Sequence, residues 1–169
     1  MALTMYQASV PVFIRGLRVL STLIGKAETY AQTHNIAPSV LLEARLAPDM
    51  LSFTGQVQRA SDTSKLSGQR LSGVVAPRFE DTETSFDELQ QRIAKTVAYL
   101  ETLQPAAFHE SESRTVQLNF GDFKPSFSGD NYLLVFALPN FFFHVTTAHD
   151  ILRHNGLPIG KLDFLGSFN

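Results

Sequence analysis

Apolar residues near the N-terminus repeat with the spacing of a helix that packs against neighbours. They fall alternately four and three residues apart, which is typical of an amphipathic helix with one buried stripe. Thr4 is suited to cap such a helix, and the polar residues 33–35 are suited to end it. The spacing therefore predicts a helix over residues 4–33. Its stripe consists of Tyr6, Val10, Phe13, Leu17, Leu20, Ile24 and Ala27.

The middle of the chain predicts three more helical segments. A short helix is expected over residues 39–46. Pro48 favours a first helical turn and predicts a long helix over residues 48–71, whose small, polar second half is suited to line a cavity or a wet groove. Ser85 and Glu88 have the spacing of a capping box and predict a helix over residues 85–103.

A change of period separates these helices from the last one. Apolar and polar residues alternate over residues 115–127, and Gly121-Asp122 suits a two-residue turn, which together predict a β-hairpin. A last helix is expected over residues 128–154, with a bend at Pro139. The fold class is therefore all-α: an antiparallel four-helix bundle with a short β-hairpin inserted before the last helix, in a single domain spanning residues 1–169. The stripe of the last helix is Leu134, Leu138, Phe141, Val145, Ala148 and Leu152.

Composition narrows the function classes. Hydrophobic residues make up 44% and charged residues 18% of the 169 positions, which excludes intrinsic disorder. A formal net charge of −2 excludes a dedicated nucleic-acid-binding protein, which would carry an excess of basic residues. The absence of cysteine excludes a thiolate nucleophile and cysteine-based metal sites. Neither a signal peptide nor an uninterrupted apolar run of membrane-spanning length is recognisable, so we expect a cytoplasmic protein with no membrane partner.

Histidines near the C-terminus are the main chemical feature. His144, His149 and His154 fall within the last predicted helix, but a pair that chelates one ion from a single helix needs a spacing of three or four residues. His144 and His149 are five residues apart, which places them about 140° apart around the helix. These imidazoles therefore need a group from another helix to form a site.

The stretch from Pro139 to Gly156 resembles the last bundle helix of the DinB/YfiT-like superfamily, and is more similar to a branch known only as a domain of unknown function. Residues 6–20 and 45–50 are also similar to that branch, so the resemblance covers essentially the whole chain. It implies a four-helix bundle that is usually dimeric. It also implies a divalent metal held by one histidine of the second helix and an H-x-x-x-H pair of the last. Some members are thiol-dependent transferases or isomerases, and others are metal-dependent hydrolases.

Carried onto this sequence, the metal pattern is incomplete. His144 matches the first histidine of the pair, the second position is Ala148, and the predicted second helix contains no histidine. We therefore expect a protein of unknown role that lacks the three-histidine site and either binds a small ligand or self-associates. The alternative is a hydrolase or transferase with an altered zinc or nickel site around His144 and Asp49, with His149 as a further candidate ligand. Asp49 also suits a purely structural role, as an anion in a first helical turn.

Three consecutive phenylalanines, Phe141, Phe142 and Phe143, cover about 200° of the last helix. One helix of a monomeric bundle buries a narrower stripe of about 100°. We therefore expect the triplet to form a homodimer contact first, ordinary core second and a small-molecule pocket third. The expected partners are a second copy of the chain and a small ligand.

Overall fold

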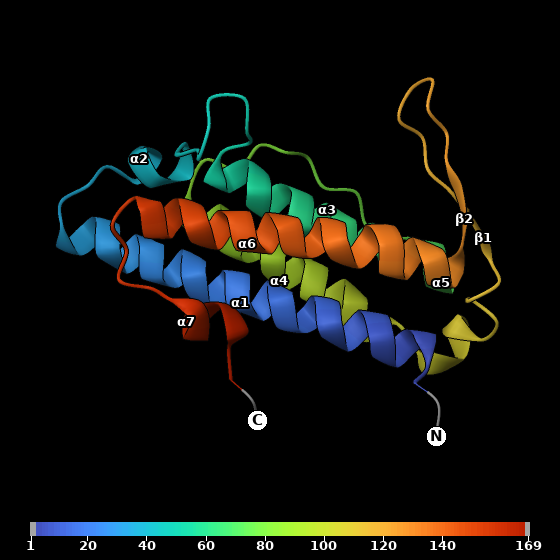
Figure 1. Ribbon diagram of the computed structural model, residues 1–169. Helices are drawn as coiled ribbons and strands as arrows, with labels where there is room; N and C mark the ends of the chain where they lie inside the picture. The colour runs from blue at the N-terminus through green and yellow to red at the C-terminus, as the bar shows by residue number, and fades with distance from the viewer. Residues whose placement is uncertain (1–2, 168–169) are drawn as a thin grey trace.

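The apolar stripes of four helices meet along one axis in the computed structural model, which describes residues 3–167 (Figure 1). The helices are α1 (Met5–Thr33), α3 (Phe53–Ser72), α4 (Phe86–Thr102) and α6 (Leu138–His154). Each packs on two neighbours, in the ring order α1, α4, α3, α6. The predicted all-α bundle with a hairpin before the last helix is confirmed. Fully buried core side chains include Phe13, Leu17, Phe53, Leu89, Leu100, Phe141 and Leu152.

The helix directions differ from a strict alternation. Helix α3 runs parallel to α4, because Ser61 contacts Thr96 and Gly68 lies against Leu100 further along both helices. The loop 73–85 makes this possible by returning along the bundle before α4 begins (Figure 1). The pairs α1–α4 and α3–α6 are antiparallel. This crossover loop covers the polar face of α3.

Helix α1 has the boundaries that its stripe predicts. The Thr4 hydroxyl accepts from the Gln7 amide, and the Gln7 side chain returns to the Thr4 amide, so the N-terminus is doubly capped. In the part of the chain that the structure describes, α1 alone is long and apolar enough to cross a membrane. Half of its most apolar window is buried inside the bundle, so the helix serves as a core element.

The second long helix begins later than Pro48, and this prediction was wrong. Helix α2 is short (Pro38–Leu42), and the chain from residue 43 to 52 forms turns. Ser52 caps α3 by accepting from the Gly55 amide. The amide of Phe53 bonds the Ala44 carbonyl across these turns. Asp49 therefore lies exposed in a turn and not in a first helical turn.

The hairpin pairs β1 (Thr115–Gln117) with β2 (Ser126–Ser128) in antiparallel register, after the 3₁₀ turn η1 (Pro105–Phe108). Its turn is the predicted one: the Phe120 amide donates to the Phe123 carbonyl around Gly121, whose φ of 71° suits glycine. The hairpin projects from the bundle at the end where α6 begins (Figure 1).

The last helix is irregular in its first half. A short helical turn α5 (Gly129–Asn131) leads into a π-helical stretch η2 (Tyr132–Ala137), which continues into α6. A π turn holds one residue more than an α turn, so the buried stripe shifts by one position. Leu133 is therefore fully buried, whereas Leu134, predicted in the stripe, is 62% exposed. A bend was expected at Pro139; the irregularity of this helix is instead the π-helical stretch η2, which ends just before the proline.

The chain ends against α1. Gly156, with a φ of 94°, terminates α6, and the short helix α7 (Lys161–Leu165) follows. His149 of α6 holds this segment, since its Nε2 lies 3.2 Å from the Gly160 carbonyl oxygen and its ring meets Phe164 edge-on.

Candidate functional site

A cleft of about 340 Å³ lies between α3 and α6, with the hairpin at one end. Because α3 runs antiparallel to the last helix, the hydrogen bonds between them follow in order: His144 with Gln56, Asn140 with Thr63, and Tyr132 with Arg70. Four apolar and seven polar residues line the cleft, so a small molecule there would meet several polar groups beside apolar side chains. Its lining residues are Arg59, Asp62, Thr63, Leu66, Arg70, Leu118, Asn119, Phe120, Phe136, Asn140 and His144.

Larger hollows lie elsewhere but carry less chemistry. One of about 650 Å³ follows α1 and α7, and another of about 630 Å³ follows the C-terminal half of α1. The imidazole of the second, His34, is stacked on Tyr30 and bonded to the Tyr30 carbonyl. The α3–α6 cleft is smaller, yet it is lined by His144, the histidine that matches the first position of the metal pattern.

A hydrogen-bond relay fixes the tautomer of His144. The Gln56 side-chain amide donates to the Leu51 carbonyl at 3.2 Å, which turns its Oε1 toward His144. The distance from this Oε1 to Nδ1 of His144 is 2.7 Å. Because an amide oxygen only accepts, Nδ1 must carry the ring proton. Nε2 is therefore left with a free lone pair on a residue that lines the cleft.

The same imidazole is held in its neutral form. Burial opposes its charge, and the nearby positive charge of Arg59 opposes it further, so the pKa of His144 falls from 6.5 to about 4. At pH 7 the side chain is consequently a hydrogen-bond acceptor and a weak base at Nε2, and it carries no charge.

A network of charges lies behind the cleft, on the face of α3 covered by the crossover loop. Arg92 of α4 is only 2% exposed and bonds Asp62 at 2.9 Å, Asp81 at 3.0 Å and Glu83 at 2.8 Å. Lys65 also bonds Asp62, at 2.9 Å, and Arg59 bonds Asp81. The predicted polar half of α3 therefore faces two ways, toward buried ion pairs and toward the cleft.

The residues around His144 do not fit a three-imidazole metal centre. A zinc ion sits about 2.0–2.2 Å from each nitrogen or oxygen ligand, so two ligand atoms on one ion are roughly 3.3 Å apart. Nδ1 of His144 and Oε1 of Gln56 are 2.7 Å apart, in direct hydrogen bond, so these two atoms do not share an ion and only Nε2 of His144 is left to bind one. Ala148 occupies the place of the second imidazole. Within residues 3–167, no three histidine, aspartate or glutamate side chains are grouped so that they could hold a metal.

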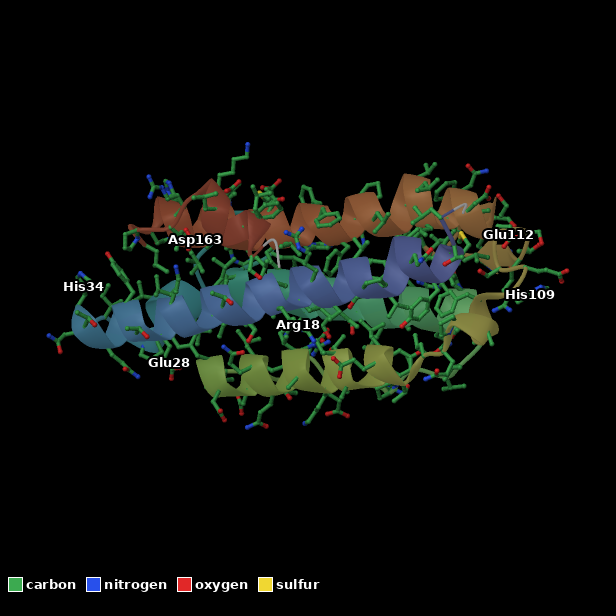
Figure 2. The ribbon with its side chains drawn as sticks, turned by 90° about the horizontal axis from the view of Figure 1, so that it is seen from below. Arg18, Glu28, His34, His109, Glu112 and Asp163 are labelled. Carbon is green, nitrogen blue, oxygen red and sulfur yellow. The ribbon has the colours of Figure 1, made fainter. Side chains whose placement is uncertain are left out.

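The structure does not bring the other predicted ligands to His144. Asp49 lies exposed in the turns before α3, outside the cleft. His149 is 9% exposed and bonds Asp150 and the Gly160 carbonyl, so it holds the C-terminal segment. His34 and His109 lie at opposite ends of the bundle (Figure 2). Within residues 3–167, Asp49, His149 and His144 therefore do not form a three-residue group that could hold a metal.

The three phenylalanines have different environments. Phe141 is fully buried and packs edge-on against Phe13, with ring centroids 5.1 Å apart. Phe142 is 36% and Phe143 is 55% exposed, and neither lines the α3–α6 cleft. Phe141 is therefore part of the ordinary core. Phe142 and Phe143 lie at the surface, where the expected dimer contact stays a prediction.

Sequence reasoning missed Gln56, Arg59, Arg70 and Asn140 as site residues. The first three lie on α3 at intervals that place polar groups along one helical face, together with Thr63. That spacing was the available signal, since a helix in a bundle core is not expected to carry a polar stripe inward. Asn140 lies within an apolar run of the sequence, so its position gave a weaker signal.

Comparisons with known proteins agree with this architecture. The family described as "Domain of unknown function (DUF1993)" matches residues 5–165. The crystal structure of a DinB family member protein from Shewanella denitrificans is similar over 96% of this chain and 92% of that chain, with 38% sequence identity and a TM-score of 0.91. A comparison with curated proteins finds no match.

Proposed function

This chain belongs to the DUF1993 family of unknown function and has a DinB-like bundle, and from that premise we propose that it binds a small organic ligand in the α3–α6 cleft. The proposal rests on one observation: His144 lines the cleft, and the hydrogen bond from its Nδ1 to Oε1 of Gln56 leaves its Nε2 unprotonated. A neutral acceptor on the wall of a cleft selects a ligand that carries a hydroxyl or N–H donor. The proposed site needs no metal.

The state of His144 provides the first test. NMR of ¹⁵N-histidine-labelled protein is expected to show His144 protonated on Nδ1 and neutral down to about pH 4. Changing Gln56→Glu places a carboxylate against Nδ1–H, which stabilises the imidazolium and raises the His144 pKa. A wild-type His144 protonated on Nε2, or already charged at pH 6, would contradict the relay.

Ligand binding is tested with phenol, a neutral probe with one hydroxyl donor and an apolar body. We expect millimolar phenol to shift the Nε2 resonance of His144 in the wild type, because its hydroxyl donates to that nitrogen. Exposed His154, at the end of α6, is the internal control, and its resonances should stay unchanged. If phenol moves neither His144 nor the amides of Thr63 and Asn140, the proposed site is wrong.

Catalysis is the second candidate, favoured by the same free lone pair. A neutral Nε2 can take a proton from a bound donor, so His144 could act as a general base. This replaces the alternative of a metal-dependent hydrolase or thiol-dependent transferase built on His144 and Asp49. The variant His144→Gln retains an acceptor but cannot act as a base, so it should keep ligand binding and abolish any turnover.

We also propose that the chain forms a homodimer through apolar residues exposed on the helix from residue 129 to 154. Leu134 is 62%, Val135 is 64% and Phe143 is 55% exposed, which is unusual for large apolar side chains on one helix. Light scattering at micromolar concentration should give the mass of a dimer. Phe143→Ser is expected to shift the equilibrium toward monomer, and a monomeric wild type would contradict the proposal. Cytoplasmic residence, without nucleic-acid or membrane partners, stays a prediction.

A further inference from the structure

Arg70 differs from the other charged residues of the α3–α6 cleft. Asp62, the one carboxylate among the lining residues, is bonded by Lys65 and Arg92, and Arg59 is paired with Asp81. Arg70 is partly buried, and within residues 3–167 it has no carboxylate partner. Its positive charge is therefore the uncompensated charge of the cleft.

The guanidinium of Arg70 is nevertheless held in place. Nη1 donates to the Tyr132 hydroxyl at 2.9 Å, and the guanidinium carbon lies 5.6 Å from the centre of the Tyr132 ring. Tyr132 is fully buried, and its hydroxyl also bonds Ser67 at 2.9 Å. One side of the guanidinium is thus fixed, while the Nε–Nη2 edge makes no hydrogen bond to residues 3–167. A planar edge of this kind matches the two oxygens of a carboxylate.

The rest of the cleft defines the body of the ligand. Phe136 and Phe120, with ring centroids 5.9 Å apart, and Leu118 of the hairpin form apolar walls near Arg70. His144 lies twelve residues from Tyr132 along the same helix, so the acceptor and the cation are near opposite ends of the cleft. Between them the lining residues of the cleft offer no second unpaired cation, because Arg59 is bonded to Asp81. These features favour an elongated monoanion over a phosphate.

From this arrangement, and resting on the proposed ligand site, we infer that the cleft binds a small carboxylic acid. Arg70 holds the carboxylate, Phe120 and Phe136 contact an apolar body, and Nε2 of His144 accepts from a hydroxyl or N–H group at the far end. The ligand class is therefore an elongated hydroxy- or amino-substituted carboxylate of the size of a phenylpropanoate.

A matched pair of probes tests the charge requirement. The probes 3-(4-hydroxyphenyl)propanoate and its amide have nearly the same shape and differ in charge. Titration calorimetry of the full chain at low salt is expected to give binding about tenfold tighter for the acid, because Arg70 adds a charge-assisted pair. In Arg70→Gln this preference should fall to about twofold or less, and Arg70→Lys should keep part of it. The matched control is Arg78→Gln, since Arg78 is exposed on the crossover loop outside the cleft, and it should keep the full preference.

The outcomes separate this inference from the proposed function. If acid and amide bind equally and both shift the Nε2 resonance of His144, the ligand site stands and the role of Arg70 is wrong. If neither probe nor phenol perturbs His144, the ligand site itself is wrong. Should Arg70→Gln fold poorly, as judged by circular dichroism, the test is made with Arg70→Lys. In the wild type, an unchanged preference for the acid in the presence of 1 M chloride would overturn the inference.

Discussion

Replacing Arg92 by methionine is expected to lower the free energy of unfolding by about 3–5 kcal/mol, because it removes the most buried member of an ionic network and leaves the carboxylate of Glu83 unpaired. Arg92 is 2% exposed, and Glu83 has no other cationic partner among residues 3–167. Urea unfolding at pH 7 measures the change. The loop 73–85 should also become more susceptible to proteolysis, since Asp81 and Glu83 hold it against Arg92.

Arg18→Met is the matched control. Arg18 bonds Glu101 at 3.1 Å, close to the distances of the Arg92 pairs, but both side chains are more than half exposed, and Arg18 lies on the outer surface of α1 (Figure 2). Exposed pairs contribute only about 0–1 kcal/mol. In the double variant Arg92→Met, Glu83→Gln, part of the lost stability should return, because one unpaired carboxylate is removed. Equal losses for Arg92→Met and Arg18→Met would show that the network does not stabilise the fold.

The network also predicts an acid-dependent effect. Burial opposes ionisation of Glu83, but hydrogen bonds from Arg92 and Gln58 outweigh it and lower the pKa below the ordinary 4.5. A carboxyl with a lowered pKa stabilises the fold above its ordinary pKa, and this contribution is lost as the pH falls through the folded-state value. The difference in stability between wild type and Arg92→Met should therefore be largest near neutral pH and should narrow below about pH 4.5.

Phe141→Ala is expected to cost about 3–5 kcal/mol, the range for deleting a buried phenylalanine ring. Phe141 is fully buried, packs on Phe13, and lies so close to Gly16 that a Cβ at Gly16 would overlap its ring. Phe143 lies two residues further along, about 200° around the helix, and is exposed, so Phe143→Ala should change the stability of the monomer by less than about 1 kcal/mol. Similar costs for the two substitutions would contradict the assignment of Phe141 to the core.

A double variant tests the close approach of α1 and α6. Gly16→Ala alone should destabilise the protein, because the added methyl meets the Phe141 ring. In the Phe141→Ala background the same change should be neutral or stabilising, since the space is empty and alanine favours a helix over glycine by about 1 kcal/mol. If Gly16→Ala is equally damaging in both backgrounds, the contact between Gly16 and Phe141 does not limit helix packing.

The helices themselves were largely predictable from local signals. The stripe of α1 and the reciprocal caps at Thr4 and Ser85 are set by residues within a few positions of one another, and both capping boxes form. Gly121-Asp122 likewise specifies its own turn. The start of α3 was not predictable from Pro48, because a later serine, Ser52, caps the helix more directly, and contacts between the Phe53 and Ala44 backbones hold the turn before it.

The candidate site was predictable only in part. His144 was recognisable from the resemblance and does line the cleft, but its expected partners were taken from sequence spacing and from the metal pattern. Asp49 lies in a turn and not in a first helical turn, because the helix that was expected to include it begins at Phe53. Gln56, the residue that decides the protonation of His144, lies 88 positions away in sequence, and no local pattern joins them.

By itself the sequence determined that four long helices form, which face of most of them is apolar, and that His144 belongs to the last helix. The tertiary structure decided which polar groups meet. Helical periodicity is a property of neighbouring residues, whereas the pairing of α3 with α6 depends on the direction and rotation of whole helices. Here the crossover loop sets the direction, and the π-helical stretch η2 shifts the phase by one residue. Those two features give His144 an amide partner and leave the edge of Arg70 open.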